Sequence, residues 1–339
     1  MAILEVEDLR VSFNTADGIV RAVRGLSFTV DRGQTVAIVG ESGSGKSVAT
    51  QTIMGLTRGA SIGGAARFDG EDLLGAPESR LREIRGAKIA MIFQDPLTSL
   101  HPLYRVGWQI VEMIRAHDRS SSRAAARARA ADLLGMVGIP NAPQRLDDYP
   151  HQFSGGMRQR VMIAMAMALD PAVLIADEPT TALDVTVQAQ VLGVMRRLQE
   201  EFETAIVLIT HDLGVVADVA DEVVVMYAGS VMERAPRREL FYRYHHPYTE
   251  GLLASLPSAA GGRARLKPMP GSPPSLIALP GGCPFAPRCP YAFELCAQKP
   301  PLAPVYGSTG HESACWLSSD EETRHSTPMT RTLDVGESA

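Results

Sequence analysis

The stretch TVAIVGESGSGKS, from Thr35 to Ser47, decides the fold of this chain. Its first five residues are mostly apolar and predict a short buried strand, and VATQTIMGL directly after it predicts a helix. A strand, a glycine-rich loop and a helix in this order begin a parallel α/β unit. We therefore expect an α/β fold with this loop at the edge of its sheet.

The loop GESGSGKS matches the pattern of a phosphate-binding loop at every position. Glycines let the backbone curl so that its N–H groups face a polyphosphate, and the N-terminus of the next helix adds positive potential. Lys46 would neutralise the β- and γ-phosphates of ATP, and the Ser47 hydroxyl would bind Mg²⁺. The expected ATP-binding residues of this loop are Gly40, Ser42, Gly43, Ser44, Gly45, Lys46 and Ser47.

Two adjacent carboxylates follow the buried strand predicted at Val173–Ala176. Ligands of open α/β sheets lie at the carboxyl ends of strands, where Asp177 and Glu178 stand. We expect Asp177 to hold Mg²⁺ through water and Glu178 to act as the general base on an attacking water. The alternative is that both residues merely begin a loop.

Four further motifs flank these sites, and together with them they resemble the ATP-binding-cassette (ABC) family. The resemblance covers about residues 1–235 and implies a P-loop NTPase (RecA-like) cassette with an antiparallel β subdomain. It also implies a helical insert at about residues 97–168, where VGWQIVEMIRAH has helical spacing. The motifs are Gln94 in IFQDP (the Q-loop), FSGGM at 153–157 (the signature), Ala182-Leu183-Asp184 (the D-loop) and His211 after IVLIT (the switch histidine).

The resemblance assigns a task to each motif. Two cassettes of this family pack head to tail, so Ser154, Gly155 and Gly156 would contact the γ-phosphate of the partner's ATP. His211 would contact the γ-phosphate of the chain's own ATP, and Gln94 would lie near Mg²⁺ and the attacking water.

Two positions depart from the family's signature, and a third has an alternative interpretation. The signature has Phe153 and Met157 where the family has Leu and Gln. Phe13 is the candidate for stacking on adenine, and a core strand residue is the alternative.

The stretches FSGGMRQRVMIAMAMAL and IADEPTTALDVTVQAQ are similar to the D-type ATPases of dipeptide, oligopeptide and nickel importers. His246-Pro247-Tyr248-Thr249 resembles the motif that opens their C-terminal extension. This resemblance implies a second, non-identical ATPase, two membrane permeases and an extracytoplasmic peptide-binding protein as partners. It places the chain at the cytoplasmic face of the membrane.

Four cysteines lie close together in the region after residue 235. We expect a C-terminal extension at residues 236–316 and a disordered tail at 317–339. Four thiolates within a short stretch can enclose one soft metal centre, and some peptide-importer ATPases carry a [4Fe–4S] site there. Zinc, unligated buried cysteines and a disulfide pair are the alternatives. The predicted ligands are Cys283, Cys289, Cys296 and Cys315.

Charge and hydropathy exclude some classes of function. A net charge of -5 argues against a broad nucleic-acid-binding face. No signal peptide and no apolar run long enough to cross a bilayer is visible in the sequence. A nickel or other small-solute importer, a soluble ribosomal or DNA-repair ABC ATPase and a metal-sensing regulator are the alternatives to a peptide importer.

Overall fold

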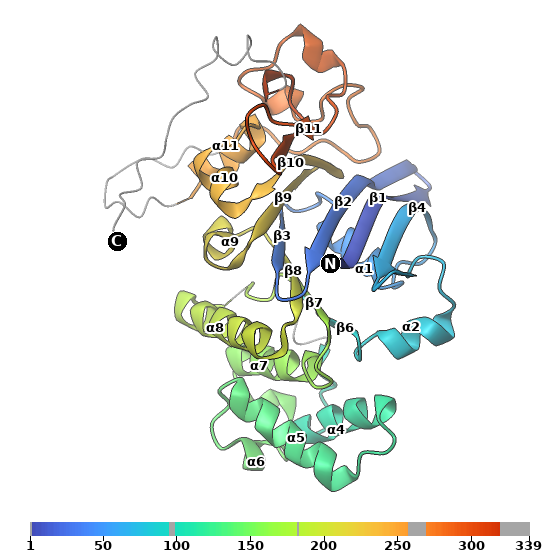
Figure 1. Cartoon of the computed structure of the whole chain (residues 1–339), viewed down its shortest axis with the longest axis vertical. Helices are drawn as coiled ribbons and strands as arrows, with labels where there is room; N and C mark the ends of the chain where they lie inside the picture. The colour runs from blue at the N-terminus through green and yellow to red at the C-terminus, as the bar shows by residue number, and fades with distance from the viewer. Residues whose placement is uncertain (1, 95–98, 182, 257–268, 319–339) are drawn as a thin grey trace.

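A computed structural model describes residues 2–94, 99–181, 183–256 and 269–318 of the chain. Two β-sheets occupy its middle, a group of helices lies at one end, and the C-terminal extension lies at the other (Figure 1). Residues 97–98 of the expected insert, Ala182 of the expected D-loop and positions 319–339 of the expected tail lie outside the described residues.

The larger sheet has eight strands in the order β11-β12-β10-β9-β3-β8-β7-β6. Its five strands from β9 to β6 are parallel, as the expected α/β unit requires. Three of them are buried along their whole length, which explains their continuous apolar sequences. The strands are β3 (Thr35–Val39), β6 (Ile89–Ile92), β7 (Val173–Asp177), β8 (Ala205–Thr210), β9 (Glu222–Tyr227), β10 (Ser230–Pro236), β11 (Ala303–Pro304) and β12 (Glu312–Ser313).

The smaller sheet is antiparallel, with the order β2-β1-β4-β5. One face of it packs on the same apolar core as the parallel strands, through residues such as Leu4, Leu26 and Phe28. The fold is therefore a P-loop-type α/β core with an antiparallel β subdomain, as predicted. The strands are β1 (Ala2–Thr15), β2 (Gly18–Asp31), β4 (Ala60–Phe68) and β5 (Glu71–Asp72).

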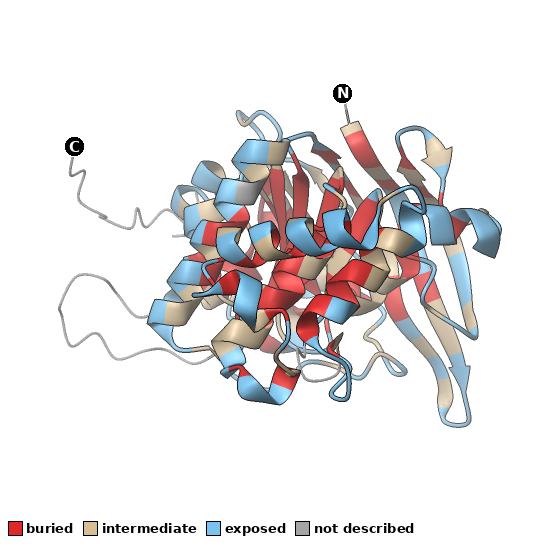
Figure 2. Cartoon of the chain, turned by 90° about the horizontal axis from the view of Figure 1, so that it is seen from below, coloured by how far each residue is buried: buried red, intermediate tan, exposed pale blue. Residues whose placement is uncertain are grey.

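Helices surround the parallel strands, and most of those between β6 and β7 gather at one end of the molecule (Figure 1). Seen from that end, buried residues fill the strands and the helix faces that meet them, while the outward helix faces are exposed (Figure 2). Outside the extension, the helices are α1 (Lys46–Ile53), α2 (Glu78–Ile84), α4 (Val106–His117), α5 (Arg123–Met136), α6 (Ala142–Arg145), η1 (Pro150–Gln152), α7 (Gly155–Ala166), α8 (Val185–Phe202) and α9 (Leu213–Val219).

The C-terminal extension is joined to the main sheet. Its strand β12 pairs with β10, so that Glu233 lies opposite Ser313, and β11 pairs with β12. The fully buried carboxylate of Glu233 also bonds to Nε2 of His311, at 2.8 Å. The helices of the extension are α10 (Arg237–Tyr242), α11 (Pro247–Ala254), η2 (Ala286–Arg288), η3 (Glu294–Ala297) and η4 (Trp316–Ser318).

None of the described helices has both the length and the apolar character needed to cross a membrane.

Candidate functional site: a nucleotide pocket at the carboxyl ends of β3 and β7

The loop between β3 and α1 has a backbone that only glycine can supply at two positions. Gly40 and Gly45 have φ angles of 151° and 99°. A Cβ atom on Gly40 would lie 2.1 Å from the carbonyl oxygen of Met226, and one on Gly45 would lie 2.1 Å from that of Ala22. Neighbouring backbone therefore fixes the curled conformation in which the loop can present its N–H groups to phosphate.

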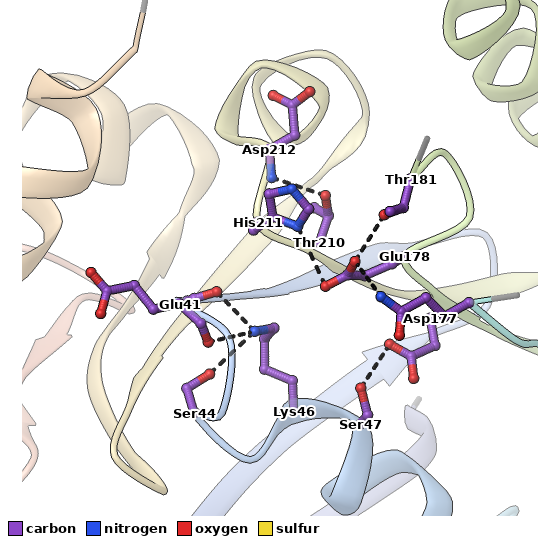
Figure 3. A network of polar contacts seen from close by, with 12 residues as sticks. Glu41, Ser44, Lys46, Ser47, Asp177, Glu178, Thr181, Thr210, His211 and Asp212 are labelled. Carbon is purple, nitrogen blue, oxygen red and sulfur yellow. Dashed lines mark hydrogen bonds and ion pairs between the residues drawn. The ribbon is translucent and has the colours of Figure 1, made fainter. Parts of the chain in front are cut away.

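The Lys46 ammonium lies inside this loop (Figure 3). It donates hydrogen bonds to the carbonyl oxygens of Gly40, at 2.8 Å, and Glu41, at 3.0 Å, and to Oγ of Ser44, at 3.2 Å. Burial lowers the pKa of Lys46, and the nearby carboxylates of Glu178, Asp177 and Glu41 oppose that shift. The charge is thus held by weak carbonyl partners, which phosphate oxygens can replace.

Ser47 and Asp177, the two predicted Mg²⁺ ligands, are in contact. Oγ of Ser47 donates to Oδ1 of Asp177 at 3.0 Å. Burial raises the pKa of Asp177, while the Ser47 hydrogen bond and the Lys46 charge act in the opposite direction. A hydroxyl and a carboxylate this close are hard oxygen ligands of the kind that Mg²⁺ binds beside phosphates.

Glu178 lies at the centre of a second group of side chains (Figure 3). Its Oε2 accepts from Nε2 of Gln94 at 2.9 Å and from Oγ1 of Thr181 at 2.8 Å. Its Oε1 is 3.3 Å from Nδ1 of His211. The residue has a left-handed φ of 48°, and its N–H donates to the Ile209 carbonyl at 2.8 Å.

Burial, a hydrogen bond and two basic side chains together set the pKa of the Glu178 carboxyl. Burial raises its pKa, but the Thr181 hydrogen bond and the neighbouring His211 and Lys46 outweigh burial, so its pKa lies below the ordinary value. An ionised carboxylate fixed by three neighbours can orient a water for attack on a phosphoryl group.

The structure brings Gln94, 84 positions before Glu178, and His211, 33 positions after it, into contact with the Glu178 carboxylate. Thr181 is a further partner of this carboxylate. Thr181 was missed because a threonine in a loop carries no signal of its own. Its position three residues after Glu178, close enough for a side-chain hydrogen bond, is the only sequence hint.

Ser154 and Asp184 lie at the N-termini of two helices. Ser154 accepts the N–H of Met157 at 3.3 Å and caps α7, and Asp184 accepts the N–H of Val187 at 2.9 Å and caps α8. Both residues are exposed, and within the described parts of the chain neither is hydrogen-bonded to Lys46 or Glu178.

The departures at the signature have a structural explanation. Phe153 is buried in the core of the insert, where Arg145 lies over its ring at 5.7 Å. Met157 is partly buried against the same core. Both side chains therefore pack toward the insert and leave Ser154 and Gly155 exposed, while Gly156 is half-buried.

Phe13 lies in β1, opposite Val20 and Ala60 in the antiparallel sheet, and is partly buried against the core. Part of the ring is accessible, and stacking on adenine stays a prediction.

The four cysteines are free thiols that line one small cavity. Burial raises the pKa of three of them, to about 11 for Cys289 and about 12 for Cys315. Across the described residues, no three His, Cys, Asp or Glu side chains are arranged to hold a metal ion. None of the four cysteines is in a disulfide. Together they do not form a group of ligands close enough to hold a single metal ion.

Comparison with known proteins agrees with this geometry. Residues 23–181 match the family model "ABC transporter", and residues 232–296 match "Oligopeptide/dipeptide transporter, C-terminal region". The oligopeptide transport ATP-binding protein OppD of Salmonella typhimurium is 52% identical over 94% of this chain and 95% of its own length. The dipeptide transport ATP-binding protein DppD of Bacillus subtilis is 49% identical over 95% of this chain and 96% of its own.

A solved structure supports the fold separately. A dimeric ATP-binding cassette in a post-hydrolysis state with ADP and Pi has a TM-score of 0.63 and 26% identity. It covers 69% of this chain and 99% of its own. On these matches, the chain belongs to the ABC transporter family of ATP-binding proteins, in the branch that carries the oligopeptide/dipeptide transporter C-terminal region.

Proposed function

We propose that this chain hydrolyses ATP to power the import of dipeptides or oligopeptides through an ABC transporter. One observation carries the proposal: an ionised Glu178, held by Gln94, Thr181 and His211, lies beside a loop that buries the charge of Lys46. This combination supplies a phosphate site and a base for water in the same place.

Each residue then has a defined task in hydrolysis. Lys46 and the loop N–H groups bind the β- and γ-phosphates, and Ser47 and Asp177 hold Mg²⁺. Glu178 orients and deprotonates the attacking water, with Gln94 beside it. His211 contacts the γ-phosphate and stabilises the charge that develops there.

A second ATPase subunit completes the site. The N-terminus of α7, with the exposed Ser154 and Gly155 and the half-buried Gly156, would contact the γ-phosphate bound by that partner. Asp184 and Val185 are exposed, so they are open to contact by the second subunit. The partner is a second, non-identical ATPase, as in the D-type branch.

Two membrane permeases are the proposed partners at the helical end. An exposed aromatic patch, formed by Leu103, Tyr104 and Trp108, lies at the start of α4, where the last two rings stack at 4.2 Å. Leu103 is 78% exposed. This patch suits a docking helix of a permease, which would place the chain at the cytoplasmic face of the membrane. An extracytoplasmic binding protein would deliver the peptide.

The division of labour along the chain is also a proposal. The cassette spans residues 1–235 with its helical insert at about 97–168, the extension spans 236–316, and a tail follows. Peptide cargo is favoured over nickel because the relatives described above are named for oligopeptide and dipeptide transport. Their similarity along nearly the whole chain also disfavours a ribosomal or DNA-repair ATPase and a metal-sensing regulator.

The test is ATP-driven peptide uptake by the complete transporter in proteoliposomes. Lys46→Ala should abolish uptake because the phosphates lose their buried positive charge, whereas Lys88→Ala, at an exposed position, should leave uptake unchanged. A complex that takes up nickel but no peptide would reassign the cargo. Uptake that persists in Lys46→Ala would remove this chain as the motor.

For the cysteines, a [4Fe–4S] cluster is the proposed occupant and zinc the alternative. All four cysteines and His246 line the same cavity. Nδ1 of His246 accepts the N–H of Tyr248 at 3.0 Å. Burial lowers the pKa of His246 to about 3, so the ring is neutral with its proton on Nε2. Four thiols around one cavity, beside a neutral imidazole, supply the sulfur ligands that an iron–sulfur cluster uses.

The fit demands movement of the cysteine loops. The free volume between the lining residues is about 10 Å³, roughly one water molecule. A four-iron cluster is wider than a single ion, so its ligands stand further apart than those of zinc. When bound, such a group would cross-link the extension, whose loops have little regular structure.

Anaerobic purification of the chain, with metal analysis, absorption and EPR spectra, separates these occupants. We expect about four iron atoms per chain and a reducible cluster signal. Cys296→Ser should remove both. Stoichiometric zinc without iron would support the zinc alternative, and absence of both metals would reject a metal site.

A further inference from the structure

The acidic residue of the phosphate-binding loop faces away from the nucleotide site. Figure 3 shows the Glu41 side chain pointing to the opposite side of the loop from the Lys46 ammonium. Its carboxylate accepts two hydrogen bonds from the guanidinium of Arg288, at 2.7 Å to Nη1 and 3.0 Å to Nη2. These two residues are 247 positions apart, and Arg288 belongs to the C-terminal extension.

The arginine half of this ion pair is enclosed, whereas the Glu41 side chain is 26% exposed. The Arg288 side chain is 6% exposed, and its guanidinium lies over the rings of Tyr227 and Phe285 at 5.6 and 6.0 Å. Its remaining donors reach the Tyr227 hydroxyl, at 3.1 Å, and the Pro270 carbonyl, at 2.8 Å. A bidentate pair fixes the relative position of its partners, and removal of the Glu41 carboxylate would leave the buried Arg288 guanidinium uncompensated.

A second contact from the extension reaches the same residue. The N–H of Glu41 donates to the Tyr248 hydroxyl at 2.9 Å. Tyr248 is fully buried, and it packs against Tyr227 and Phe285 at 4.7 and 5.3 Å between ring centres. The carbonyl of Glu41 accepts from Lys46, so every polar group of Glu41 is held, two of them by the extension.

We infer that Arg288 and Tyr248 are positioning residues of the nucleotide site, and that the C-terminal extension holds the first turn of the phosphate-binding loop in its binding conformation. Because Glu41 directly follows Gly40 and shares the Lys46 ammonium with it, a shift of Glu41 would move the groups that face the phosphates. The inference rests on the proposed function only in taking ATP as the ligand.

The geometry gives the extension a task besides packing. Arg288 ends η2 and directly precedes Cys289, so the same short helix borders both the cysteine cavity and the phosphate-binding loop. Release of Arg288 would loosen the loop without touching any group that contacts ATP. The expected effect is therefore on ATP affinity and on the KM for ATP, with little change in kcat at saturating ATP.

The test measures binding of a fluorescent ATP analogue with Mg²⁺ to the full-length chain, and KM and kcat in the assembled transporter. Arg288→Gln and Glu41→Gln should each weaken binding about tenfold, and the double variant should be no weaker than either. Arg288→Lys should restore binding only in part, because an ammonium cannot make the two parallel hydrogen bonds. Tyr248→Phe removes a single hydroxyl and should weaken binding about threefold; it also serves if Arg288→Gln does not fold.

Arg234→Ala is the matched control. Arg234 pairs with Glu222 and, at 3.8 Å, with Glu312, so it also ties the extension to the core, but it has no contact with the phosphate-binding loop. It should leave ATP affinity unchanged. The inference is overturned if folded Arg288→Gln and Tyr248→Phe bind ATP as tightly as the native chain, or if Arg234→Ala weakens binding as much. A native chain that binds no ATP would instead refute the proposed function.

Discussion

At the residue scale, the nucleotide site is built from positions where space or a single contact allows one residue type. Most of these positions could be identified from the sequence because their spacing matches the phosphate-binding-loop pattern. Lys46, Ser47, Asp177 and Glu178 lie close together in the structure. Glu41 and Arg288 were not anticipated, because a contact across 247 positions leaves no local pattern.

Two glycines of the loop give a stability prediction. Gly45→Ala should destabilise the chain by about 2–4 kcal/mol, because its Cβ would lie 2.1 Å from the Ala22 carbonyl and the φ of 99° is strained for alanine. Gly43→Ala should cost only about 1 kcal/mol, since it shares a positive φ of 78° but has nothing within 4 Å. Urea unfolding of both variants checks this. Equal losses would show that backbone strain, and not the carbonyl contact, sets the requirement.

At the element scale, the strands and helices differ in how clearly the sequence predicts them. The strand and helix around the phosphate-binding loop were clear because the apolar run is bounded by glycines. Strand β4, ASIGGAARF, was not predicted, because its glycines and alanines have weak strand preference and its order comes from pairing with β1. Strand β6, Ile89–Ile92, was also not predicted.

The N-cap of α7 gives a prediction that separates stability from catalysis. Ser154→Ala should cost about 1 kcal/mol, because the cap to Met157 is lost, and it should also lower ATP turnover in the assembled transporter. Ser122 is the control, since it caps α5 in the same way by accepting the N–H of Ala125 at 3.1 Å. Ser122→Ala should lose similar stability and keep full turnover. If the two variants have equal turnover, Ser154 acts only as a cap.

At the scale of the whole molecule, the extension was predicted as an appendage, and the structure shows it joined to the core. Its strands β11 and β12 continue the main sheet, where Glu233 pairs with Ser313. Two strands of two residues each, inside a proline-rich region, carry no periodicity that a sequence could display. Only the folded chain reveals that the extension reaches back to the nucleotide site.

The aromatic patch at the helical end gives a prediction for assembly. Trp108→Ser should weaken association with the permeases and reduce ATP-driven uptake, because an exposed aromatic side chain contributes most when an interface buries it. Tyr242→Ser is the control, because Tyr242 is 45% exposed and Trp108 is 44% exposed, but Tyr242 lies in α10 at the opposite end. Co-purification of the permeases with each variant gives the measurement. Unchanged co-purification and uptake for Trp108→Ser would place the permease contact elsewhere.

The central claim is that this chain hydrolyses ATP with Glu178 as the base, at a site that a second ATPase completes. The most direct measurement is ATP turnover by the assembled transporter carrying Glu178→Gln, together with the amount of ATP that stays bound. The account predicts turnover at this site lower by a factor of about 10² to 10⁴, with ATP retained, because Lys46, Ser47 and Asp177 still bind the Mg²⁺ nucleotide. Turnover close to that of the native complex would contradict it.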